Sequence, residues 1–243
     1  MNRVRRIAFA AVTVLAAVAA PAARAAAQGA PNSAAGNGSH GPDSAVAPII
    51  LPAMGTWMFA PFVGGGVNSP VGYNWGITPD RDHLFVGLHM ATPVLRFNRL
   101  TLLYAPNWVP FIIVSNNPRY ETVTSSGVPR KVESRRGPVY GTGLVPFGLQ
   151  LETPLSRRVA LYSMAGIGGA WFSDVMPQDG AKRFNFSIEF GGGAYVQTRR
   201  RHATVIGYKF HHFSNMYTAR ENPGLDGHVF YLGMRWLKRL PRE

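Results

Sequence analysis

Short segments in which apolar and polar residues alternate recur along this chain, although they are weak at about 57–68, 100–115 and 158–173, and they restrict its fold more than any other feature. From Phe184 to Phe190 every second residue is apolar, and the residues between are small or polar. Successive side chains of a β-strand point to opposite faces, so this alternation predicts strands with one apolar face. We expect eight strands, at about 57–68, 83–96, 100–115, 139–152, 158–173, 183–198, 203–216 and 226–237.

The connections between these strands alternate in length. Long or polar segments that contain Gly or Pro lie at 69–82, 116–138, 174–182 and 217–225, and short turns lie at 97–99, 153–157 and 199–202. A meander with its long loops at one end and its tight turns at the other is typical of an outer-membrane barrel. A soluble β-sandwich gives no reason for such alternation. We therefore expect an all-β fold, an eight-stranded antiparallel transmembrane β-barrel of the bacterial outer membrane.

In a barrel, one face of each strand points toward lipid and the other toward the interior. The interior of an eight-stranded barrel has room only for side chains, so the apolar faces should point toward lipid. Glu189, Lys209 and Arg235 then point inward on three consecutive strands, where they can neutralise one another. Four prolines fit poorly within central strands and should coincide with bulges: Pro61, Pro106, Pro110 and Pro146.

The N-terminal residues have the pattern of a secretory signal. Three arginines between positions 3 and 6 precede an apolar segment at 7–20 and a small-residue cleavage site, so residues 1–27 are predicted to be removed. Residues 28–55 read as a disordered leader, 56–238 as the barrel, and 239–243 as a short tail. Without the signal, 21 basic residues face 12 acidic ones, a formal charge of +9.

Composition excludes several kinds of membrane attachment and partner. The chain has no cysteine, which excludes a lipoprotein anchor. No segment after the signal is apolar for the 18 or so residues that a membrane helix needs. The basic turn at 199–201 lacks the interleaved aromatic residues of a nucleic-acid site, and we expect no nucleic-acid partner.

Two neighbouring strands near the C-terminus bring chemically reactive side chains to one face. His212 and Ser214 share the apolar face of strand 203–216, and Asp226 begins the apolar face of the next strand. Directly opposed residues of an antiparallel pair have Cβ atoms about 5 Å apart. A hairpin would therefore gather a nucleophile, a base and an orienting carboxylate. Asn215 and a nearby backbone N–H could stabilise the oxyanion, and Glu221 is an alternative acid.

At these residues the sequence resembles the outer-membrane lipid A 3-O-deacylase family (PagL type). The matching segments are His212–Asn215 and Asn222–Asp226, and the strand layout extends a weaker likeness over 57–237. The best-known members have Glu in place of Asp226 and Ala-Gly in place of Met216–Tyr217. The resemblance implies Ser214 as the nucleophile, His212 as the base, Asp226 as the acid and Asn215 as the oxyanion side chain.

The resemblance implies a serine esterase that removes the 3-O-acyl chain of lipid A. Its partners would be lipopolysaccharide in the outer leaflet and the membrane itself, and its serine chemistry needs no cofactor or metal. The alternative is a small outer-membrane barrel with a structural or adhesion role and no catalysis. A pore is a weaker alternative, because eight strands leave an interior filled by side chains.

Overall fold

A computed structural model of the chain describes residues 52–67, 69–70, 75–199 and 201–237. The predicted signal (1–27), most of the predicted leader (28–51) and the predicted tail (239–243) lie outside these residues.

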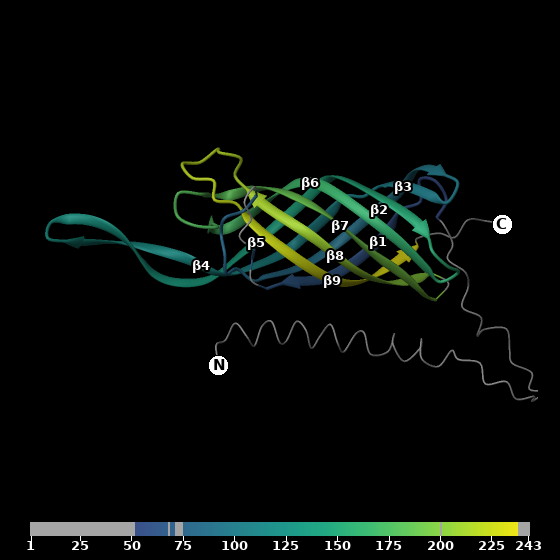
Figure 1. The fold of residues 1–243 in the computed structure, drawn as a ribbon, viewed down its shortest axis with the longest axis horizontal. Helices are drawn as coiled ribbons and strands as arrows, with labels where there is room; N and C mark the ends of the chain where they lie inside the picture. The colour runs from purple at the N-terminus through teal and green to yellow at the C-terminus, as the bar shows by residue number, and fades with distance from the viewer. Residues whose placement is uncertain (1–51, 68, 71–74, 200, 238–243) are drawn as a thin grey trace, which may run out of the picture.

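The described residues form nine β-strands that close into one antiparallel ring (Figure 1). The strands are β1 (Met58–Gly66), β2 (His83–Phe97), β3 (Leu100–Tyr104), β4 (Asn107–Ser125), β5 (Val128–Pro154), β6 (Val159–Met176), β7 (Lys182–Arg199), β8 (His202–Ser214) and β9 (Leu225–Leu237). β1 pairs with both β2 and β9, which closes the sheet. The described part of the chain has no helix long and apolar enough to cross a membrane.

The ring counts as eight strands because β3 and β4 are two halves of one. Both pair with β2 on one side and β5 on the other, and they are separated at Ala105–Pro106. The prediction of one continuous strand at 100–115 was therefore wrong. Pro106 has no N–H to contribute, but its carbonyl accepts from the Met90 N–H and the Ala105 N–H donates to the Gly148 carbonyl.

Two other prolines lie where bulges were expected, but Pro61 does not: β1 pairs with β2 without a register shift, with Pro61 opposite Leu88. The β4–β5 register shifts between Val109 and Ile112, which brackets Pro110. The β5–β6 register shifts between Leu144 and Phe147, which brackets Pro146. A bulge leaves a residue out of the ladder, so it accommodates a residue that cannot donate.

A long hairpin corrects the prediction of a loop at 116–138. β4 and β5 continue beyond the barrel wall, pairing from Asn117 opposite Gly137 to Ser125 opposite Val128 (Figure 1). Its tip has positive φ at both Ser126 (52°) and Gly127 (77°), which matches a two-residue hairpin turn. Most of its side chains are exposed on both faces. Such a hairpin needs no apolar alternation, which is why sequence periodicity did not reveal it.

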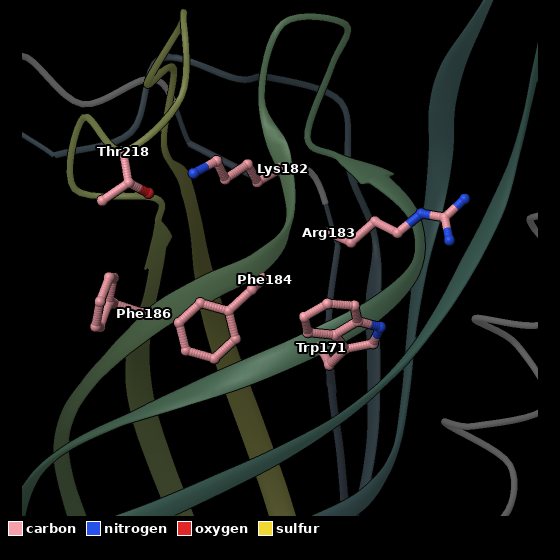
Figure 2. A pocket seen from close by; sticks show the side chains of 6 residues that line it. All are labelled: Trp171, Lys182, Arg183, Phe184, Phe186 and Thr218. Carbon is pink, nitrogen blue, oxygen red and sulfur yellow. The ribbon is translucent and has the colours of Figure 1, made fainter.

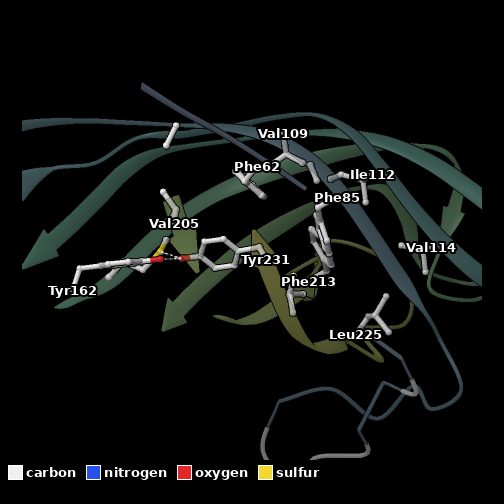
Figure 3. Packing of buried hydrophobic residues seen from close by; sticks show 14 of the residues in the cluster. Phe62, Phe85, Val109, Ile112, Val114, Tyr162, Val205, Phe213, Leu225 and Tyr231 are labelled. Atoms are coloured by element: carbon white, nitrogen blue, oxygen red, sulfur yellow. Dashed lines mark hydrogen bonds between the residues drawn. The ribbon is translucent and has the colours of Figure 1, made fainter. Parts of the chain in front are cut away.

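Burial along the strands confirms the predicted faces. On β8 the outward-facing Ile206 is 54% exposed, whereas its inward-facing neighbour Val205 is buried. Inside, aromatic and aliphatic side chains from strands all around the ring form one cluster, in which the Tyr162 and Tyr231 hydroxyls are hydrogen-bonded at 2.7 Å (Figure 3).

The interior charges are neutralised in pairs. Lys209 Nζ lies 2.5 Å from Glu189 Oε2, and the same carboxylate accepts from the Asn107 amide at 3.0 Å. Arg235, expected to join this pair, instead donates to Glu152 Oε1 at 2.6 Å. Each of these four charged side chains is at most 5% exposed.

We predict that Lys209→Met lowers the free energy of unfolding by about 3–5 kcal/mol, because it leaves the Glu189 carboxylate buried without its cation. Urea titration of the folded barrel in lipid vesicles would measure this. The double variant Glu189→Gln/Lys209→Met should recover most of the loss, since it removes both charges. Equal stability of the single variant and the wild type would contradict the pairing.

Candidate active site

The register of β8 against β9 brings His212 and Asp226 together. They are direct partners across the sheet, and His212 Nδ1 lies 2.6 Å from Asp226 Oδ1. A carboxylate can only accept, so the imidazole proton belongs on Nδ1, which leaves Nε2 unprotonated in the neutral ring. The two residues, which sequence parity placed on the same face, are therefore in contact.

Ser214 is the last residue of β8 and lies two positions beyond His212 on the same outward face. Its Oγ accepts a hydrogen bond from the Met216 N–H at 3.3 Å, and no hydrogen bond joins it to His212 in this structure, so of the three expected partners only His212 and Asp226 are in contact. The chain turns sharply here, because Met216 (φ 50°) and Tyr217 (φ 60°) both adopt the left-handed conformation. This turn directs the N–H of residue 216 back toward the serine hydroxyl.

Asn215 ties together the loop that follows β8. Its side-chain amide donates to the Glu221 carbonyl at 2.6 Å, and its backbone N–H donates to Asn222 Oδ1 at 2.9 Å. The residue is 1% exposed. The role of Asn222 was missed, because Asn-Pro-Gly is ordinary turn sequence and carries no sign of a contact with Asn215.

A segment from the β1–β2 connection, Trp75–Thr78, lies across the loop before β9, and we call it the strap. The Gly76 N–H donates to Asp226 Oδ2 at 2.8 Å, so both carboxylate oxygens of Asp226 are held. The Ile77 N–H donates to the Pro223 carbonyl, and Thr78 Oγ1 donates to the Gly224 carbonyl at 2.7 Å. Sequence reasoning treated 69–82 only as a loop, since it contains no motif.

The strap also covers the histidine. The Trp75 ring packs edge-on against His212, with centroids 5.4 Å apart at 81°, and it contacts the rings of Phe190 and Phe210. His212 is consequently only 7% exposed, although its strand face points out of the barrel. The His212–Asp226 pair is therefore shielded from water.

Arg81 anchors the base of the strap. Its guanidinium donates to the carbonyls of Pro79 and Pro177, and its backbone N–H donates to Ser69 Oγ. Ser69 Oγ in turn donates to the Thr78 carbonyl at 2.7 Å. Burial lowers the pKa of Arg81 from its ordinary value. These bonds join the two ends of the β1–β2 connection.

Glu221, the alternative acid, is not part of this contact. It is exposed in the loop after β8, where its carboxylate accepts from the Gln178 amide at 3.1 Å. His211 points into the barrel and shares a hydrogen bond with Ser187 at 2.8 Å. Among the described residues, no three His, Asp or Glu side chains are grouped so as to hold a metal ion.

An open groove of about 500 Å³ lies on the outer wall beside Ser214. Its lining residues are Trp171, Lys182, Arg183, Phe184, Phe186 and Thr218. Figure 2 shows the three aromatic rings in a row along the wall, with the two cationic side chains at one edge. Phe186 is the direct β7 partner of Ser214, so the groove begins one strand away from the serine.

Comparisons with known proteins show what the chain resembles. A family model described as "Lipid A 3-O-deacylase (PagL)" matches residues 116–235, a range that contains His212, Ser214, Asn215 and Asp226. The resemblance inferred from the His212–Asp226 segment is therefore confirmed. A comparison with curated protein sequences found no match.

Solved structures match at the level of the fold. The crystal structure of the outer-membrane enzyme PagL superposes with a TM-score of 0.51 at 13% identity, over 72% of this chain and 97% of that one. Neisserial surface protein A superposes with a TM-score of 0.45 at 12% identity, over 75% and 97%. The expected all-β outer-membrane barrel is confirmed.

Proposed function

We propose, from the match to the lipid A 3-O-deacylase family, that this barrel is an outer-membrane serine esterase that removes the ester-linked 3-O-acyl chain of lipid A. The observation that carries the proposal is the His212–Asp226 contact beside Ser214, on the outward face of the matched segment. Activated serine requires a base and a group that orients it, and these three residue types supply both.

In the first half of the reaction, Ser214 Oγ attacks the ester carbonyl carbon while His212 Nε2 takes the hydroxyl proton. Asp226 keeps Nδ1 protonated and stabilises the imidazolium that forms. The tetrahedral intermediate then expels the sugar 3-oxygen, which receives the proton from His212. In the second half, His212 activates water, which releases the fatty acid from the serine.

The oxyanion needs hydrogen-bond donors aimed at the position that its oxygen will occupy. The Met216 N–H already lies against Ser214 Oγ, at 3.3 Å, and is our first candidate. Asn215 is the second. An amide nitrogen carries two N–H groups, so its bond to the Glu221 carbonyl leaves one for the oxyanion.

The placement suits a lipid substrate that is not extracted from its bilayer. Long loops of outer-membrane barrels face the cell exterior, the side on which lipid A lies. The row of Trp171, Phe184 and Phe186 beside Ser214 offers a path for the acyl chain along the outer wall. An ester lying at this level would reach Ser214 from the lipid.

Mass spectrometry of lipid A from a host that expresses the wild type or Ser214→Ala tests the activity and the nucleophile together. We expect loss of one 3-hydroxyacyl mass with the wild type alone. Unchanged lipid A with a folded wild-type barrel, verified by heat-modifiable gel mobility, would favour the non-catalytic barrel instead.

The roles within the site predict graded losses in purified enzyme. Ser214→Ala and His212→Ala should lower kcat by roughly 10³-fold or more, and Asp226→Asn by roughly 10²–10⁴-fold. Glu221→Gln is the matched control and should keep wild-type kcat. Full activity of Asp226→Asn together with loss in Glu221→Gln would move the acid role to Glu221.

The strap predicts a further loss. A Cβ at Gly76 would lie 2.8 Å from the Asp226 carboxyl, so Gly76→Ala must displace either the strap or the carboxylate. We expect kcat to fall by roughly 10–100-fold, because the histidine loses its fixed orientation. Gly137→Ala is the control, since its Cβ would meet only Arg119 Nε at 3.8 Å. Equal kcat in the two variants would show that the strap is dispensable.

A further inference from the structure

We infer that Lys182 and Arg183 form an anion-binding rim that holds a phosphate group of an acylated glycolipid, with its hydrocarbon chain on the aromatic row below. This inference rests on the proposed function and specifies how its substrate is positioned. It assigns phosphate binding to the groove, a role separate from ester cleavage.

The rim and the aromatic row belong to one surface. Lys182 begins β7 and shares the outward parity of Phe184 and Phe186. Figure 2 shows Lys182 on the same side of the row as Thr218, and the Arg183 guanidinium on the side of Trp171. The two cations therefore span the upper edge of the groove, at the end of the barrel from which the long hairpin extends (Figure 1).

Neither cation is neutralised within the described part of the chain. No carboxylate there lies within 4.0 Å of the Lys182 or Arg183 side chain, and both residues are exposed. The nearby acids have other partners: Asp174 pairs with Arg119, Asp179 with Lys131 at 2.7 Å, and the Glu221 carboxylate, beside Gly180, accepts from the Gln178 amide at 3.1 Å. Two uncompensated positive charges thus remain beside an apolar surface.

A cationic rim beside an apolar surface should bind a molecule that has both an anionic group and a hydrocarbon chain. Arginine and lysine donate charge-assisted hydrogen bonds to phosphate, and aromatic side chains contact hydrocarbon. Inorganic phosphate would contact only the cationic rim, and an uncharged ester would contact only the aromatic rings. A phosphorylated, acylated sugar uses both, and binding its phosphate at the rim would hold the acyl ester near Ser214, one strand away.

The test compares Lys182→Gln/Arg183→Gln with the wild type, as purified full-length barrels in detergent micelles, on bisphosphorylated and on dephosphorylated lipid A. We expect KM for the phosphorylated lipid to rise about tenfold with kcat unchanged, the scale of one or two lost charge-assisted hydrogen bonds. On the dephosphorylated lipid the variant and the wild type should agree. Arg157→Gln/Arg158→Gln, in the β5–β6 turn at the opposite end, is the control with unchanged kinetics.

Binding in the Ser214→Ala background separates this inference from the proposed function. Phosphate-dependent binding that is weakened by the rim substitutions, without hydrolysis by the wild type, would support the rim and contradict the esterase. Equal effects on both lipids, or no effect on the phosphorylated one, would overturn the rim. If phosphatidylglycerol competed as strongly as lipid A, the rim would be a phospholipid site, and the proposed binding of a glycolipid phosphate would be wrong.

Discussion

The pairing of β1 with β9 is the interaction on which the rest of the structure depends. In hydrocarbon an unpaired strand edge leaves N–H and C=O groups without partners, at a cost of several kcal/mol each. β1 pairs with β2 on one side and with β9 on the other, so the ring has no edge. The interruption at Ala105–Pro106 and the bulges around Pro110 and Pro146 are tolerated because they interrupt the ladder without opening the ring.

Closure also gives neighbouring residues different chemistry. His211 and His212 are adjacent in the chain, yet His211 bonds Ser187 inside the barrel and His212 contacts Asp226 on the outside. Inside, polar groups must pair with one another, as Glu189 and Lys209 do. Outside, the same alternation places a potential base and nucleophile where a lipid can reach them. The alternation of side chains along a strand thus places the structural charged residues inside the barrel and the candidate catalytic residues outside it.

The sequence predicted the strands and the outward face that His212 and Asp226 share. Both follow from the period of two along a strand and from the order of neighbouring strands. It failed at the hairpin, since β4 and β5 beyond the wall bury no face and carry no alternation. It also failed at the partner of Arg235. Parity shows that this side chain points inward, but the choice of Glu152 over Glu189 depends on how side chains cross the interior.

Sequence alone determined the inward or outward direction of residues in the strands that alternate clearly, and the face shared by His212, Ser214 and Asp226, because local alternation fixes both. Tertiary structure decided what surrounds that face. The Gly76 N–H that holds Asp226 lies 150 residues away in the chain, and Trp75 covers His212 from the same segment. A backbone N–H is common to every residue except proline, so no residue pattern marks the one that reaches a given carboxylate. Only the closed ring, which brings the β1–β2 connection against the β8–β9 loop, decides that contact.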